Sequence, residues 1–140
     1  MDNLFNAGLK RAFDILFSLI VLVLLSPVYL IIAALIYVDS PGPLLYKPVR
    51  IGEGGKKFTC YKFRTMHENE SPENNTKSTT VNDKRITKIG AILRKHNLDE
   101  LPQFLNVFMN QMSVVGPRPH RTFLNKDMQQ KVQGYMIRHY

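Results

Sequence analysis

The sequence predicts an α+β fold that is mainly helical, with an N-terminal re-entrant membrane helix-break-helix followed by a small globular domain that contains a short β-hairpin. Three observations support this prediction. Residues 15–38 form a 24-residue stretch without a charged side chain, whereas the other 116 residues carry all 30 charges. Two short segments rich in β-branched and aromatic residues flank a glycine-rich turn. Farther along the chain, apolar residues recur with the period of a helix.

Length and composition exclude several classes of protein. A chain of 140 residues is too short for a two-domain enzyme, a (β/α)8 barrel or a full dinucleotide-binding fold. The single cysteine, Cys60, excludes an intrachain disulfide and a zinc site made of four cysteines. Cys60 lies in a predicted strand and is expected to be a packed thiol. The four histidines lack the spacing of metal ligands, so no zinc site is expected.

The apolar stretch predicts membrane association. About 20 apolar residues are enough to cross a bilayer as one helix, and residues 15–38 exceed that length. Ser26 and Pro27 lie in the middle of the stretch, where proline removes a backbone donor and bends the helix. Each arm would then be roughly 18 Å long, which is too short to cross the bilayer alone. An ordinary kinked spanning helix is the alternative.

Basic residues flank both ends of the apolar stretch, and this favours the re-entrant form. Under the positive-inside rule, both flanks are expected on the cytoplasmic side of the membrane. The flanking basic residues are Lys10 and Arg11 before the stretch and Lys47, Arg50, Lys56 and Lys57 after it. The chain is therefore expected to divide into a membrane anchor, residues 1–39, and a globular domain, residues 40–140.

The globular domain carries two basic blocks joined by an acidic loop. The net charge is −1 for residues 1–39, +5 for 40–67, −3 for 68–83 and +7 for 84–140, the C-terminal basic block. A basic surface beside a membrane suits anionic lipid headgroups or a phosphorylated substrate. Nucleic acid is not expected as a partner, because the sequence contains no recognition helix, stacking platform or metal finger.

Local patterns predict a hairpin and a long loop after the anchor. Residues 44–51 and 57–63 are expected to pair around the turn at 52–56. Pro48 makes the first of these strands an edge strand or a broken one. Residues 68–83 are polar and are expected to form a long loop.

Helices are expected to follow in the C-terminal basic block. The apolar spacing predicts a helix over residues 85–97. A second apolar segment covers residues 98–108, with Pro102 tolerated in its first turn. Residues 116–119, Gly-Pro-Arg-Pro, must form a rigid loop, and a last polar helix is expected over 122–133.

An acidic pair, Asp99 and Glu100, lies within the C-terminal basic block. Neighbouring cations should keep both carboxylates ionised. An ionised carboxylate can attack phosphorus to form an acyl phosphate, and a second carboxylate can help to hold Mg²⁺. Arg64, Arg94 and Arg118 could then bind phosphate oxygens in a bidentate manner. The alternative is that Asp99 caps a helix that begins around Glu100 and takes part in no chemistry.

Seven motifs, taken in order, resemble the successive signatures of the bacterial sugar transferases, the monotopic polyprenol-phosphate phosphoglycosyl transferases. They cover nearly the whole chain. The motifs are Lys10-Arg11-Ala12-Phe13-Asp14, Ser40-Pro41-Gly42-Pro43, Gly55-Lys56-Lys57-Phe58, Tyr61-Lys62-Phe63-Arg64-Thr65-Met66, Asp83-Lys84-Arg85-Ile86-Thr87-Lys88-Ile89-Gly90, Leu98-Asp99-Glu100-Leu101-Pro102-Gln103 and Met112-Ser113-Val114-Val115-Gly116-Pro117-Arg118-Pro119.

The resemblance implies a reaction and its partners. Members of the family move a sugar 1-phosphate from a nucleotide diphosphate sugar, usually a UDP-hexose, to a polyprenol phosphate such as undecaprenyl phosphate. They release UMP and start the synthesis of a glycan. The implied location is the bacterial inner (cytoplasmic) membrane, with the catalytic domain on the cytoplasmic face and the lipid bilayer as a further partner. The sequence leaves open whether the chain forms a homo-oligomer.

The resemblance also implies roles for individual residues. Asp99 would be the nucleophile that forms a phosphosugar-enzyme intermediate, and Glu100 would support Mg²⁺, with Asp99 as its companion ligand. The implied phosphate-binding residues are Lys62, Arg64, Arg94 and Arg118. Ser26 and Pro27 match the break of the family's re-entrant membrane helix.

Three departures from the family pattern are visible. Pro48 replaces a frequent glutamine, and Asn110-Gln111 replaces a glycine-acidic pair. The sequence stops at Tyr140, where family members continue into a segment rich in proline and glycine. The 140-residue chain is therefore expected to be weakly active or inactive by itself. A catalytically weak, membrane-tethered module that binds anionic lipid or a phosphorylated ligand is the alternative function.

Overall fold

The computed structural model describes residues 2–52, 55–67, 83–116 and 120–121. Helices make up the larger part of these residues and short antiparallel strands the rest of the regular structure, which confirms a mainly helical α+β fold. The loop predicted at 68–83 lies outside the described residues except for Asp83, and the helix predicted at 122–133 lies outside them entirely. The chain folds into two compact units. Unit 1 comprises Met1–Leu24, Lys47–Tyr61 and Gln103–Tyr140, and unit 2 comprises Leu25–Tyr46 and Lys62–Pro102.

The apolar stretch forms two helices, α1 (Asp2–Leu24) and α2 (Ser26–Asp39), separated at Leu25. Pro27 lies in the first turn of α2, where a missing N–H breaks no helical hydrogen bond. The interruption thus falls one residue before the predicted break at Ser26. Within the part of the chain that the structure describes, no single helix combines the length and the apolar composition needed to cross a membrane, whereas Ala7–Leu24 and Ser26–Asp39 meet these criteria together as a bent pair.

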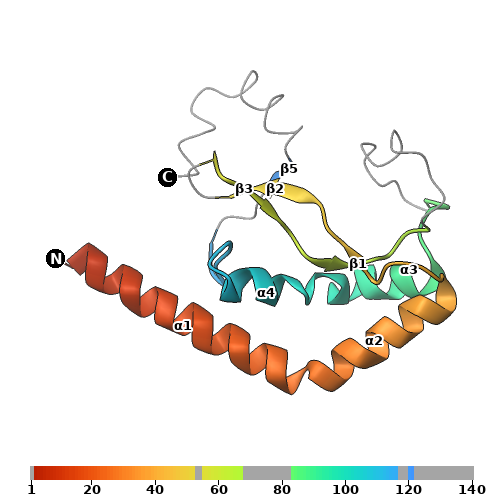
Figure 1. Ribbon diagram of the computed structural model, residues 1–140, viewed down its shortest axis with the longest axis horizontal. Coiled ribbons are helices and arrows are strands. Elements are labelled where there is room, and N and C mark those ends of the chain that lie inside the picture. Colours follow the sequence, from red (N-terminus) through yellow and green to blue (C-terminus); the bar gives the residue numbers. More distant parts are fainter. Residues whose placement is uncertain (1, 53–54, 68–82, 117–119, 122–140) are drawn as a thin grey trace. The chain divides into compact units, whose positions relative to one another are not determined.

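In unit 1, α1 packs along α4 (Gln103–Phe108), as Figure 1 shows. The rings of Phe17 and Phe104 lie 6.1 Å apart between their centroids. Arg11 donates hydrogen bonds of 2.8 Å to the carbonyl oxygens of Val107 and Phe108, at the end of α4. The Val107 carbonyl also accepts a hydrogen bond of 3.1 Å from the N–H of Asn110, so Arg11 adds a second donor there and ties α1 to the end of α4.

Unit 1 also contains the predicted hairpin. β2 (Val49–Ile51) pairs with β3 (Lys57–Thr59) and, on its other side, with β5 (His120–Arg121), all antiparallel. The carbonyl of Pro48 accepts a hydrogen bond from Cys60 N at 2.9 Å, but proline cannot return one. The prediction of a hairpin with a broken first strand is confirmed. Cys60 is buried and free, as expected of a packed thiol.

A buried asparagine connects the hairpin to α4. The side chain of Asn106 has no exposed surface. Its amide nitrogen donates to the carbonyl of Thr59 at 2.7 Å, and its oxygen accepts from the backbone N–H of Tyr61 at 2.9 Å. Two strand-end backbone groups thereby obtain partners without a further strand.

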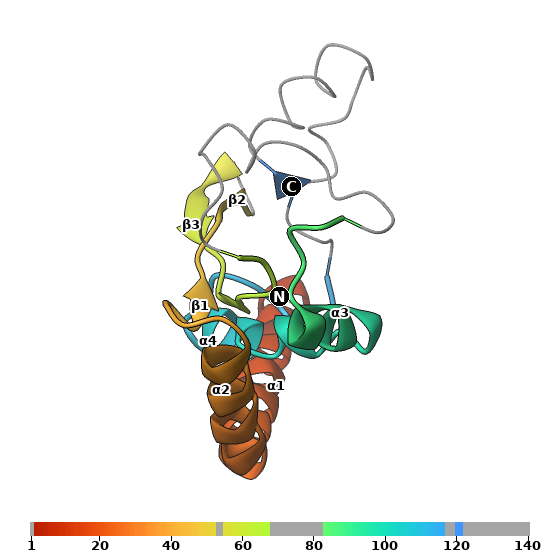
Figure 2. The same ribbon diagram turned by 90° about the vertical axis from the view of Figure 1, so that its right-hand side faces the viewer.

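In unit 2, β1 (Leu45–Tyr46) pairs with β4 (Lys62–Phe63), and two helical segments follow, α3 (Lys88–Lys95) and the short 3₁₀ helix η3 (Leu98–Glu100). α3 lies against α2 (Figure 2), and Asp39 accepts a hydrogen bond of 2.9 Å from the backbone N–H of Ile89. The core of this unit comprises Ile32, Ile36, Phe63 and Leu93.

The predicted helices of the C-terminal basic block have shorter bounds in the structure. α3 begins at Lys88 because the hydroxyl of Thr87 caps it, accepting a hydrogen bond of 2.9 Å from the N–H of Gly90. The single apolar segment predicted over residues 98–108 is wrong in detail, since η3 and α4 divide it. Pro102 lies between these two elements rather than in a first helical turn.

Candidate active site

Unit 2 brings together four of the predicted site residues from three elements. Lys62 comes from β4, Arg94 from the last turn of α3, and the acidic pair from η3. Lys62 Nζ lies 2.7 Å from Glu100 Oε1, and the two side chains are only 18% and 28% exposed. An ion pair that is largely removed from water is more strongly held than a surface pair.

The turn between α3 and η3 places the acidic pair. Asn97 adopts a left-handed conformation with φ 55°, which asparagine tolerates better than most residues, and this reverses the chain directly after α3. Asn97 is the N-cap of η3, and no side chain caps that end in the described structure. Asp99 lies inside η3, so the alternative in which Asp99 caps a helix is wrong.

Neighbouring cations favour the ionised form of Asp99, as expected, but burial opposes them. Burial raises its pKa above the ordinary value and is the largest influence. Lys62 lowers the pKa by attraction, Glu100 raises it by repulsion, and Arg94 lowers it, in that order of size. The net direction is upward, because the two cations do not offset the loss of water and the adjacent negative charge.

Arg94 and Arg64 are held in different ways. Arg94 Nε donates a hydrogen bond of 2.8 Å to the hydroxyl of Thr65. Arg64 is buried, and its guanidinium donates to the backbone carbonyls of Ser40 and Pro41, the latter at 3.5 Å. Arg64 therefore ties the end of β4 to the turn after α2. Arg118, the fourth predicted phosphate-binding residue, lies outside the described residues.

The acidic pair is compatible with a magnesium ion. Mg²⁺ is usually bound by one or two carboxylates, together with water and substrate phosphates, rather than by a cage made only of protein. Asp99 and Glu100 are adjacent oxygen donors of this kind, and both are partly accessible. Across the described ranges, no group of three or more His, Cys, Asp or Glu side chains is arranged to hold a metal ion.

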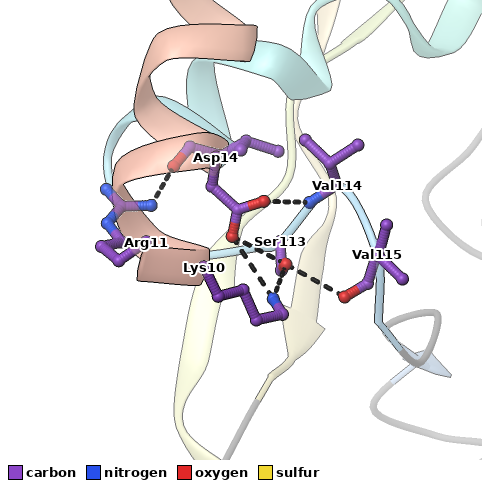
Figure 3. Close-up of polar contacts among 7 residues, drawn as sticks. Lys10, Arg11, Asp14, Ser113, Val114 and Val115 are labelled. Carbon is purple, nitrogen blue, oxygen red and sulfur yellow. Dashed lines mark hydrogen bonds and ion pairs between the residues drawn. The ribbon is translucent and has the colours of Figure 1, made fainter. Parts of the chain in front are cut away.

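Sequence reasoning missed a second polar cluster, which lies in unit 1 (Figure 3). The carboxylate of Asp14 is 3% exposed and accepts hydrogen bonds from Ser113 Oγ at 2.7 Å and from the backbone N–H of Val114 at 3.1 Å. Lys10 contacts both Asp14, at 3.4 Å, and the Ser113 hydroxyl. A lone carboxylate next to a long apolar run was the available signal, because such a group needs partners when it is buried.

The sequence of this chain matches a known protein family and several of its members. The family model described as bacterial sugar transferase matches residues 5–140. The chain is 46% identical over 134 residues to the UDP-glucose:undecaprenyl-phosphate glucose-1-phosphate transferase of Escherichia coli (strain K12), covering 96% of this chain and 29% of that protein. It is 54% identical over 112 residues to the exopolysaccharide production protein PSS of Rhizobium leguminosarum bv. phaseoli, covering 80% and 56%.

A third relative has a different sugar in its name. The chain is 42% identical over 134 residues to the UDP-N-acetylgalactosamine-undecaprenyl-phosphate N-acetylgalactosaminephosphotransferase of Aeromonas hydrophila, covering 95% of this chain and 31% of that protein. The chain thus spans about a third to a half of the length of these relatives. Because the family model covers nearly all of its residues, the chain belongs to the bacterial sugar transferase family.

Proposed function

We propose that this chain transfers a sugar 1-phosphate from a UDP-sugar to undecaprenyl phosphate through a covalent intermediate on Asp99. The observation that carries the proposal is the acidic pair in η3 with Lys62 and Arg94 around it, in a chain of the bacterial sugar transferase family. The names of the relatives from Escherichia coli and Aeromonas hydrophila supply the class of donor and acceptor.

The first half of the reaction forms an acyl phosphate. A carboxylate oxygen of Asp99 attacks the β-phosphorus of the UDP-sugar, and the bond from that phosphorus to the bridging oxygen breaks. UMP leaves with the bridging oxygen and the electron pair. The sugar phosphate is then bonded to Asp99, as in other enzymes that use a carboxylate nucleophile.

The second half regenerates the enzyme. A phosphate oxygen of the polyprenol phosphate attacks the same phosphorus, and the bond between Asp99 and phosphorus breaks. The product is a polyprenol diphosphate sugar, the first lipid-linked unit of a glycan. No net proton is gained or lost by Asp99 over the cycle, because it begins and ends as a carboxylate.

The neighbouring residues have separate tasks in this scheme. Arg94 and Lys62 offset the negative charge that gathers on the phosphate oxygens as the phosphorus is attacked. The ion pair of Lys62 with Glu100 fixes the position of both side chains next to Asp99. When bound, Mg²⁺ would neutralise the diphosphate of the donor. Glu100 and Asp99 are the residues that would hold it.

We also place the protein at the cytoplasmic face of the bacterial inner membrane. The apolar side chains of α1 and α2 are largely exposed, which is costly in water but favourable in lipid. Strongly exposed examples among their described side chains are Leu9, Leu16, Val23, Leu24, Leu30 and Val38. The polyprenol acceptor would enter from the same bilayer.

The decisive experiment is a search for the covalent adduct. The purified chain in detergent or nanodiscs is incubated with Mg²⁺ and either UDP-glucose or UDP-N-acetylgalactosamine, without acceptor, and its intact mass is measured. In keeping with weak activity, we expect part of the chain to gain the mass of one sugar phosphate and release UMP, and Asp99→Asn to do neither. Full activity of Asp99→Asn would contradict the proposal. Binding without an adduct for any donor would instead favour the tethered binding module.

A further inference from the structure

The segment after β4 and the first turn of α3 lie unusually close together in unit 2. The backbone N–H of Thr87 donates to the carbonyl of Thr65 at 3.1 Å. A Cβ atom added to Gly90 would lie 2.2 Å from that carbonyl oxygen and 2.8 Å from the Cα of Thr65. Only glycine is compatible with this approach, because real Cβ atoms do not come so near to backbone atoms. α3 therefore rests directly on Thr65.

This contact determines where the side chain of Arg94 leaves α3 relative to Thr65. Residues 90 and 94 are four apart in α3, so they share one face of the helix. Helical side chains also lean toward the N-terminus, which brings the Arg94 side chain back over the turn that contains Gly90. The hydroxyl of Thr65 lies at the end of this path and accepts the hydrogen bond from Arg94 Nε at 2.8 Å.

We infer that Thr65 is a positioning residue for Arg94, and that its hydroxyl orients the guanidinium of Arg94 toward the donor diphosphate beside Asp99. Thr65 is buried, so its hydroxyl has little competition from water. With Nε held, the planar guanidinium keeps one orientation instead of sampling several, and the ordering cost of phosphate binding falls. Thr65 itself need not touch the substrate. This inference rests on the proposed function for the identity of the ligand.

The test uses two substitutions that differ in one group. Thr65→Val keeps the shape of the side chain and removes the hydroxyl, whereas Thr65→Ser keeps the hydroxyl and removes the methyl group. The first readout is binding of UDP to the full chain by calorimetry, which requires no turnover. We expect Thr65→Val to weaken UDP binding about tenfold, the order of magnitude for a lost hydrogen bond to a charged group, and Thr65→Ser to stay within about twofold.

A double substitution separates positioning from a general structural role. If Thr65 acts through Arg94, Thr65→Val causes no further loss of UDP affinity in an Arg94→Met background. A purely structural role would lower the unfolding midpoint of Thr65→Val and leave its UDP affinity unchanged. Equal losses with and without Arg94, or wild-type affinity in Thr65→Val, would overturn the inference.

The outcomes also distinguish this inference from the proposed function. A wild-type chain that binds UDP in a Thr65-dependent way but forms no adduct would support the positioning role and contradict the covalent mechanism. If the adduct forms but Thr65→Val leaves the UDP affinity unchanged, the covalent mechanism is supported and the positioning role is contradicted. If the wild-type chain does not bind UDP, the inference is wrong, because Arg94 then serves no diphosphate, and the adduct experiment alone decides the function.

Discussion

Asp99 has a raised pKa and a proposed role that requires an ionised carboxylate, and the two together predict a pH dependence. Burial and Glu100 push the pKa of Asp99 above the ordinary aspartate value of about 3.9. The protonated acid cannot attack phosphorus, so adduct formation is lost as the pH falls through the raised pKa. We expect the acid limb of the single-turnover rate to lie at higher pH than the titration of an ordinary aspartate.

Replacing Lys62, a cation near Asp99, should move the acid limb of the rate to still higher pH. Lys62 lowers the pKa of Asp99, so Lys62→Met is expected to shift the acid limb to higher pH, beyond any change in the maximal rate. Lys57→Met is the control, since Lys57 is exposed on β3 and is not among the groups that shift Asp99. The same limb in all three proteins would show that the titrating group is not Asp99.

The site residues illustrate what a sequence can reveal at this scale. The adjacency of Asp99 and Glu100 in a basic block was visible directly. The ion pair of Lys62 with Glu100 joins residues 38 positions apart, and only the family resemblance grouped them before the structure did. The cations near Asp99 could be counted in the sequence, whereas the burial that raises its pKa depends on the fold.

At the scale of elements, the contact of α3 with Thr65 predicts that Gly90 cannot be replaced without a loss of stability. Gly90→Ala would force a Cβ to within 2.2 Å of the Thr65 carbonyl, so α3 must shift. We expect a loss of about 1–3 kcal/mol in the free energy of unfolding, as for other overpacked sites. Chemical denaturation in detergent, followed by circular dichroism, measures this change.

Gly8 in α1 is the matched control for this substitution. A Cβ at Gly8 meets nothing within 4 Å. Gly8→Ala is therefore expected to raise helical stability slightly, by about 0.5–1 kcal/mol, because alanine loses less backbone entropy than glycine in a helix. A loss of stability in Gly90→Ala together with a gain in Gly8→Ala would confirm the contact, and a neutral Gly90→Ala would contradict it.

The elements differ in how far their own residues specify them. The hairpin was predictable because a short glycine-rich turn joins strands that are neighbours in sequence. The start of α3 was misplaced by three residues, although the cap at Thr87 was a readable signal. The division of residues 98–108 between η3 and α4 had no local signal, because packing in each unit decides it.

At the scale of the whole chain, Asp14 links α1 to a segment about 100 residues later. Such a contact closes a long loop, so no local pattern could predict it. Asp14→Ala removes the buried acceptor of the Val114 N–H and leaves the Ser113 hydroxyl with the Val115 carbonyl, at 3.0 Å, as its acceptor. We expect a loss of about 2–3 kcal/mol in the free energy of unfolding, again measured by denaturation in detergent.

Lys10→Met provides the comparison for Asp14→Ala. The side chain of Lys10 is half exposed, so its ion pair with Asp14 should contribute less than about 1 kcal/mol. A loss in Lys10→Met as large as that in Asp14→Ala would indicate that the ion pair, and not the hydrogen bonds to Ser113 and Val114, holds the two segments together.

Basic residues at both flanks of the apolar stretch predict that α1 and α2 form a re-entrant pair. A re-entrant pair places Gly8 and Lys47 on the same side of the membrane, whereas a spanning helix places them on opposite sides. Both residues are exposed, and the buried Cys60 can be replaced by alanine to give a cysteine-free background. Single cysteines at these two positions can then be labelled with a membrane-impermeant maleimide.

In spheroplasts, whose inner membrane is intact, we expect neither Gly8→Cys nor Lys47→Cys to react. Both should react after the membrane is permeabilised. Leu30→Cys is the control within the apolar surface, because Leu30 is 73% exposed in the protein alone and should be shielded by lipid. Its failure to react under either condition would show that this surface is embedded. Labelling of only one of the first two positions in intact spheroplasts would establish a spanning helix and place the two ends of the bent pair on opposite faces of the membrane.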